Sequence, residues 1–104
     1  MAKNLQESVL LDFYGELLTD KQKSALELYY NEDLSLAEIA EDMQVSRQGA
    51  RAFIKQGEAH LAEFEEKLGM YKRFSAISEL LKEAKALAKD DALLKKIEDI
   101  EKHL

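Results

Sequence analysis

Apolar side chains recur at helical spacing along most of the chain, and polar capping residues interrupt them at a few positions. The clearest case lies within residues 34–61. One stripe there has the i, i+3, i+4, i+7 spacing of a buried helix face: Leu36, Ile39, Ala40 and Met43. Ser35 precedes the stripe as an N-cap, and Glu38 three residues later completes a capping box. The pattern predicts a short helix that ends near Gln44.

A second helix is predicted to begin after Ser46, whose hydroxyl supplies another N-cap oxygen. Its apolar positions are Ala50, Phe53, Ile54, Gly57 and Leu61. Two capped helices joined by a turn of roughly three or four residues form a helix-turn-helix unit. In such a unit the second helix is the one presented to the major groove of DNA.

The residues before this unit predict two more helices. The first is a helix over residues 4–18, and we expect one of its faces to pack on the core. The apolar stripe of that face is Leu5, Val9, Phe13 and Leu17, and it is widened by Leu10, Tyr14 and Leu18. Thr19 is the expected N-cap of the next helix, with Gln22 as its capping-box partner. Near the end of that helix we expect one ring of the Tyr29–Tyr30 pair inside and one at the rim.

Apolar residues at alternating spacings of three and four continue the second helix of the unit to about Leu68. The pattern changes phase after Gly69, so we expect a kink or break between Gly69 and Phe74. Two amphipathic helices are predicted beyond it, one over residues 71–88 and one capped by Asp90. The predicted fold is all-α, with a helix-turn-helix domain over residues 1–68 and a C-terminal helical extension over 69–104.

The last two helices are too few to enclose a core of their own. We therefore expect a homodimer held by the extended fourth helix and the two helices after it. The expected interface residues are apolar: Leu61, Phe64, Leu68, Tyr71, Phe74, Ile77 and Leu81. The alternative is a monomer of six helices in which the last two fold back on the first.

Composition limits the chemistry. The chain has no cysteine, which excludes disulfides and thiolate metal sites, and its two histidines, His60 and His103, are far apart in sequence. No catalytic set of residues and no phosphate-binding glycine loop is present, so we expect no enzyme activity, no cofactor and no metal site. No apolar run approaches the roughly 18 residues of a membrane span, and the first residues do not resemble a signal peptide. The cytoplasm is the expected location.

The net charge of −6 is distributed unevenly. Residues 1–42 carry three basic and ten acidic residues, whereas residues 43–57 carry three basic residues and no acidic one. Arg47, Arg51 and Lys55 are four apart, so they share a helix face, and Gln48 lies beside Arg47. Arg and Gln can bind guanine and adenine edges bidentately. These four residues are the predicted nucleic-acid-binding face; the alternative is an ordinary solvated basic face.

The stretch from Leu18 to Leu61 resembles region four of the sigma-70 family of bacterial transcription initiation factors. The segments that carry the resemblance are LTDKQKSALELYY and LSLAEIAEDMQVSRQGARAFI. The chain as a whole is similar to the YlxM family, small sigma-region-four-like proteins of Gram-positive bacteria. The flanking segments SVLLDFYGELLTDKQ and EEKLGMYKRF carry this narrower resemblance.

The resemblance implies a DNA-binding-like fold in which Arg47, Gln48 and Arg51 match the DNA-facing positions of the sigma motif. It also implies a link to the signal recognition particle pathway, because the family's gene is associated with that of the particle's GTPase. Gln44 stands where the motif usually has glycine in the turn. Two functions remain open: a dimeric regulator that binds double-stranded DNA, or an accessory factor that binds the signal recognition particle protein or its RNA.

Overall fold

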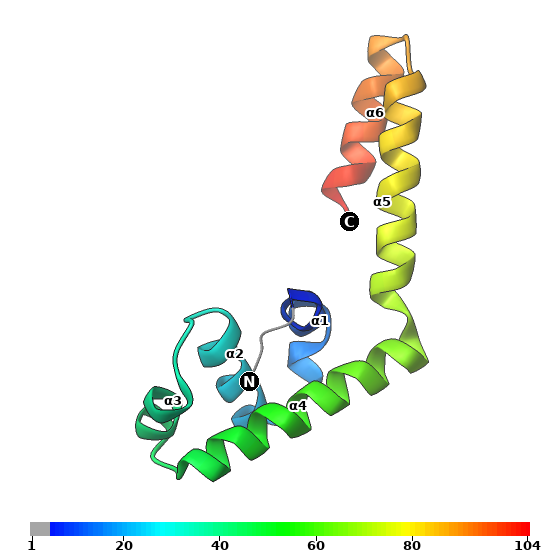
Figure 1. The fold of residues 1–104 in the computed structure, drawn as a ribbon. Helices are drawn as coiled ribbons and strands as arrows, with labels where there is room; N and C mark the ends of the chain where they lie inside the picture. Colours follow the sequence, from blue (N-terminus) through cyan, green and yellow to red (C-terminus); the bar gives the residue numbers. More distant parts are fainter. Residues whose placement is uncertain (1–4) are drawn as a thin grey trace. The chain divides into compact units, whose positions relative to one another are not determined.

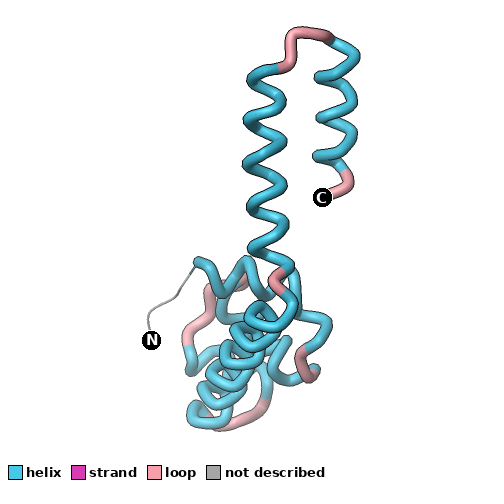
Figure 2. The backbone as a smooth tube through the Cα atoms, turned by 90° about the vertical axis from the view of Figure 1, so that its right-hand side faces the viewer, coloured by secondary structure: helices cyan, strands magenta, loops and turns pink. Residues whose placement is uncertain are grey.

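The computed structural model of the protein describes residues 5–104, and within that range it contains helices and no strands (Figure 1). The elements are α1 (Leu5–Tyr14), the 3-10 helix η1 (Gly15–Leu17), α2 (Asp20–Tyr30), α3 (Leu36–Met43), α4 (Arg47–Leu68), α5 (Met70–Leu87) and α6 (Asp91–Lys102). Short loops join the helices (Figure 2). The predicted all-α class is confirmed. None of the helices in the described range combines the length and the apolar character needed to cross a membrane.

The chain divides into two compact units, Met1–Gly69 and Met70–Leu104, called unit 1 and unit 2 below. The boundary residue, Gly69, has φ 61° and ψ 27°, and its N–H donates to the Glu65 carbonyl oxygen at 2.8 Å. Glycine adopts this left-handed conformation without a Cβ penalty, so it terminates α4 as a C′ residue. The helix break therefore occurs at Gly69 itself.

Unit 1 is built around α4, which packs against α1, α2 and α3. The largest side chains that are almost completely buried come from all four helices: Tyr14, Leu26, Ile39, Ile54 and Leu61. Burying each aliphatic side chain of this size contributes about 1.5–3 kcal/mol to folding. This shared core fixes the position of α3 and α4, the two helices of the helix-turn-helix unit.

The face that α1 buries agrees only in part with the predicted one. Leu10, Tyr14 and Leu18, which were expected to widen the stripe, are buried, as is Leu11, which was not predicted. The two ends of the predicted stripe are wrong, because Leu5 is 85% exposed and Leu17 is 57% exposed. The α-helix ends at Tyr14, and the 3-10 turn that follows has three residues per turn, so a stripe with the α-helical period cannot continue through Leu17. The first residue of the predicted helix, Asn4, lies outside the described residues.

The predicted caps are confirmed. The Thr19 and Ser35 hydroxyls each accept an N–H at 3.2 Å, and both residues form complete capping boxes. The Asp90 side chain accepts the Ala92 N–H at 2.9 Å at the start of α6. Capping groups of this kind are worth about 1 kcal/mol each. The helix starts were therefore readable from side-chain chemistry.

Unit 2 is a helical hairpin in which α5 and α6 lie side by side (Figures 1 and 2). Ile97 is the one residue of α5 and α6 that is buried, and Lys85 forms an ion pair with Glu101 at 3.4 Å. Ile77, Leu80 and Leu87 are 43–79% exposed. Their spacing of three and seven residues places them on one side of α5. This hairpin buries little of its own apolar surface.

Candidate nucleic-acid interface

The turn between α3 and α4 is short and is held by hydrogen bonds on both sides. Gln44 ends α3 in the left-handed conformation, with φ 58° and ψ 46°. The Val45 N–H donates to the Ala40 carbonyl oxygen at 2.9 Å, and the Ser46 hydroxyl accepts the Gly49 N–H at 2.9 Å. A non-glycine residue in the left-handed region costs about 1 kcal/mol, which these bonds offset. The turn fixes where α4 begins and which side chains it presents first.

One face of α4 anchors it in unit 1. The buried residues of this helix are Ala50, Ile54, Gly57 and Leu61, at spacings of three and four. Gly57 lies in close contact with α2. A Cβ added there would lie 2.6 Å from Leu26 Cδ1, so only glycine fits without displacement. Close backbone packing at this position holds α4 against α2.

The four predicted contact residues lie on the part of α4 that faces solvent. Arg47, Gln48, Arg51 and Lys55 are all exposed. Within residues 5–104, none of the three cations forms a hydrogen bond or an ion pair with another side chain. Their charges are therefore available to an external anion. The role of these residues in binding stays a prediction.

The helix start reinforces this positive charge. The first turn of α4 contains no acidic residue, and its N-terminal N–H groups carry the positive end of the helix dipole. Gly49 adds no side chain over these groups. The charge of Arg47 and the helix dipole thus both make the electrostatic potential at the start of α4 positive. A positive potential favours the binding of a phosphate or another anion there.

Sequence reasoning missed Lys21, which lies beside the same helix. Its Nζ is 5.9 Å from the centroid of the Phe53 ring, a cation–π contact between α2 and α4. Phe53 is on the flank of α4 opposite to Arg47, so cations border the exposed face on both sides. Contacts between helices leave no periodic signal in a sequence, and none pointed to this pair.

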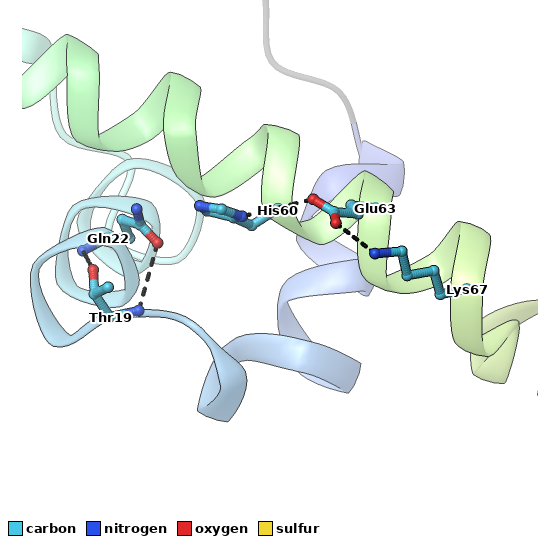
Figure 3. A network of polar contacts seen from close by, with 5 residues as sticks. All are labelled: Thr19, Gln22, His60, Glu63 and Lys67. Carbon is cyan, nitrogen blue, oxygen red and sulfur yellow. Dashed lines mark hydrogen bonds and ion pairs between the residues drawn. The ribbon is translucent and has the colours of Figure 1, made fainter.

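The positive face ends near Gly57. Beyond it, the Tyr30 hydroxyl donates to Glu58 at 2.5 Å, and burial together with this bond raises the pKa of Tyr30. Figure 3 shows Glu63 between His60 and Lys67 on the next turns of α4. The 2.8 Å hydrogen bond from Lys67 lowers the pKa of the Glu63 carboxyl. The second half of α4 is therefore occupied by internal ion pairs.

Figure 3 also shows the capping box that begins α2. The Thr19 hydroxyl accepts the Gln22 N–H at 3.2 Å, and the Gln22 side-chain oxygen accepts the Thr19 N–H at 3.5 Å. Gln22 is 7% exposed, and its Cβ would lie 3.5 Å from a Cβ at position 57. The cap thus fixes the end of α2 that supports α4.

One of the predicted dimer contacts is wrong. Leu61 is 0% exposed within unit 1, because it continues the buried stripe of α4, so a second chain cannot reach it. Phe64 is half-buried, with its ring centroid 6.0 Å from that of Tyr14. Leu68 and Ile77 are 44% and 43% exposed. The other predicted contacts are half-buried: Tyr71, Phe74 and Leu81.

Comparison with known proteins gives consistent matches. A family described as "Putative helix-turn-helix protein, YlxM / p13 like" matches residues 1–101. A UPF0122 protein of Bacillus pumilus is 47% identical over 92 residues, which cover 88% of this chain and 84% of the relative. The UPF0122 protein YlxM of Bacillus subtilis is 47% identical over 88 residues, covering 85% and 80%. A UPF0122 protein of Acetivibrio thermocellus is 42% identical over 109 residues, covering 95% and 93%.

Proposed function

The chain belongs to the YlxM/p13-like family of helix-turn-helix proteins, and from this membership we propose that it binds nucleic acid through the exposed face of α4. The proposed contacts are Arg47, Gln48, Arg51 and Lys55. The role we propose is regulatory and non-enzymatic, in the cytoplasm and in connection with the signal recognition particle pathway. Double-stranded DNA is the proposed ligand, and the particle's protein or RNA is the second candidate.

The observation that carries the proposal is the set of exposed and unpaired cations on the second helix of a helix-turn-helix unit. Two other lysines of unit 1, Lys23 and Lys67, have acidic partners. Arg47, Arg51 and Lys55 keep their charge for a ligand. Gln48 adds a side chain that can donate and accept at a base edge.

The expected binding by one chain is weak and depends on salt. Each neutralised phosphate of a duplex contributes about −0.9 to the slope of log K against log salt, so three cations give about −2.7. Two rigidly joined copies would double that slope and bind far more tightly, because the second face binds at high effective concentration. Tight binding therefore requires a second copy.

We propose that the protein is a homodimer and that the two chains contact each other through unit 2. Exposed apolar side chains follow both helices of the hairpin: Ile77, Leu80 and Leu87 on α5, with Leu93 and Ile100 on α6. Exposed apolar side chains that share one side of a helix, as those of α5 do, are common in dimer interfaces. Helix-turn-helix proteins often act as two-fold dimers on DNA.

Fluorescence anisotropy with a mixed-sequence DNA duplex tests the proposed ligand, with a hairpin RNA measured in parallel. We expect Arg51→Ala to weaken binding and to lower the salt slope by about 1 per chain. Lys67→Ala is the matched control, because it removes one positive charge from the same helix outside the face. Equal effects of Arg51→Ala and Lys67→Ala, or binding that is unchanged by Arg47→Ala and Arg51→Ala, would contradict the assignment.

Light scattering at micromolar concentration tests the dimer. We expect a mass of about twice the 11.9 kDa of one chain, because two weak apolar faces would cover each other. Ile77→Asp should give monomers, whereas Ala86→Asp, exposed on the opposite side of α5, should not. The mass of a monomer at all concentrations would contradict the proposed dimer. Each protein molecule would then present one weakly basic face. A pull-down run with nuclease at raised salt then separates a protein partner from a nucleic acid.

A further inference from the structure

A cleft lies between α2 and α3 on the side of unit 1 where the turn before α4 begins. Its volume is about 440 Å³. Three half-buried apolar side chains line it: Leu28 of α2, Met43 of α3 and Val45 of the turn. Most of the polar side chains around them are exposed, so these three residues form an apolar floor. A floor of this kind favours an apolar side chain of a ligand.

The rim of the cleft is acidic. It contains Asp20, Glu27, Glu32 and Asp42, against one cation, Lys21. Lys21 lies over the Phe53 ring, and Glu27 is 3.8 Å from Lys23. In the part of the chain that the structure describes, the other three carboxylates form no ion pair. The rim thus carries an excess of negative charge around an apolar surface, with four carboxylates against the one cation Lys21.

Two helix ends add to this negative potential. Asp42 and Met43 lie in the last turn of α3, and Glu32 lies just beyond the end of α2. Neither helix has a basic residue in its last turn. The unsatisfied carbonyl groups of a helix C-terminus carry the negative end of the helix dipole, which attracts cations. The backbone and the side chains therefore both favour a positively charged ligand.

We propose that this cleft binds an amphipathic basic segment of a protein partner, with apolar side chains on Leu28, Met43 and Val45 and Lys or Arg side chains at the acidic rim. Phosphates are repelled by the same rim, which excludes nucleic acid as the occupant. The described residues contain no cluster of three or more acidic or histidine side chains placed to hold a metal ion. A basic peptide is the ligand whose charge and apolar surface both match.

The length of the rim sets the size of the segment. Asp20 begins α2 and Glu32 lies just beyond its end at Tyr30, so the length of that helix, ten residue rises or about 15 Å, lies between them. A helical segment of roughly three turns covers that distance, with one apolar stripe on the floor. Arg47, Arg51 and Lys55 do not line the cleft, so binding here does not need the proposed contacts to nucleic acid.

A labelled synthetic peptide of three helical turns, with leucines on one face and lysines beside them, tests the proposal with the full-length protein. We expect saturable binding by anisotropy at physiological salt. Two variant peptides give the specificity: one with glutamate for lysine and one with serine for leucine, both of which should fail to bind. Equal binding of the glutamate peptide would show that the acidic rim does not select a basic ligand. If the original peptide does not bind at millimolar concentration, the cleft is not a binding site for such a segment.

Protein variants locate the binding. Glu32→Gln combined with Asp42→Asn should lower affinity roughly fivefold, because each exposed ion pair contributes a small factor. Asp12→Asn combined with Glu66→Gln is the matched control, with the same charge change at exposed positions elsewhere. All four are surface residues, so folding is retained. Equal losses in the two double variants would mean non-specific attraction and would contradict the assignment.

NMR signals of the methionine methyl groups locate the bound peptide independently of the variants. Of the two methionines within residues 5–104, Met43 lines the cleft and Met70 does not. In a methyl NMR titration with the lysine–leucine peptide, the Met43 signal should shift with peptide concentration while the Met70 signal of unit 2 stays in place. Arg51→Ala should leave this titration unchanged, which separates the cleft from the α4 face. A peptide that shifts Met70 and not Met43 would disprove the cleft as its site.

Discussion

Substitution of Gly57 by alanine tests whether α2 and α4 approach each other as closely as the structure shows. The added Cβ would lie 2.6 Å from Leu26 Cδ1, 3.2 Å from Leu26 Cγ and 3.5 Å from Gln22 Cβ. Leu26 is 0% exposed, so its side chain has no free space to move into. Overpacking of a core costs about 1–3 kcal/mol. Alanine returns about 1 kcal/mol as the better helix former. We expect Gly57→Ala to reduce the free energy of unfolding by up to about 2 kcal/mol.

A double-mutant cycle isolates the contact. Leu26→Ala removes both leucine atoms that the new Cβ would meet, so in that background Gly57→Ala should stabilise the protein by about 1 kcal/mol. The sign of the effect therefore reverses between the two backgrounds. Urea denaturation followed by tyrosine fluorescence measures it, because three of the four tyrosines are Tyr14, Tyr29 and Tyr30 of unit 1. Stabilisation by Gly57→Ala in the otherwise unchanged chain would refute the reasoning.

Three further substitutions have expected outcomes. Burial and the nearby Glu58 carboxylate raise the pKa of Glu7 above 4.5, and its buried Oε2 has no hydrogen-bond partner. The ionised form therefore destabilises the fold above that raised pKa, so Glu7→Gln should raise the melting temperature at pH 7 but not below pH 4.5, as thermal melts at both pH values would show. Ser46→Ala removes the N-cap of α4 and should cost about 1 kcal/mol in urea denaturation. Tyr14→Phe removes the 2.6 Å hydrogen bond to Glu65 and should cost about 1–2 kcal/mol, with no loss if that bond is absent in solution.

The helix starts and the helix-turn-helix unit were predictable because they depend on local chemistry. Ser35 and Ser46 each bond to an N–H three residues later, which a sequence records directly. The left-handed conformation of Gln44 followed from its place in the motif. The exposure of Arg51 followed from its place opposite the apolar stripe. Local hydrogen bonds and helical periodicity account for these successes.

The predictions that were wrong concern residues whose burial depends on packing between helices. The sequence of α1 has apolar residues on several sides, and only the position of α4 determines that Leu11 is buried and Leu5 is exposed. Leu61 was assigned to a dimer because its spacing suits any helical partner, and the partner proved to be unit 1 itself. The cleft at Met43 combines residues of α2, α3 and the turn, so no single stretch of sequence indicates it.

The division of the chain at Gly69 has a consequence for synthesis on the ribosome. Every helix that packs on α4 in unit 1 precedes Gly69, so the whole core of that unit is available before any residue of unit 2 has been made. Domains generally fold as units, and N-terminal ones first, as the chain is made. The helix-turn-helix unit can therefore fold without any contact from α5 and α6. Association of two chains through the hairpin would then join units that are already folded.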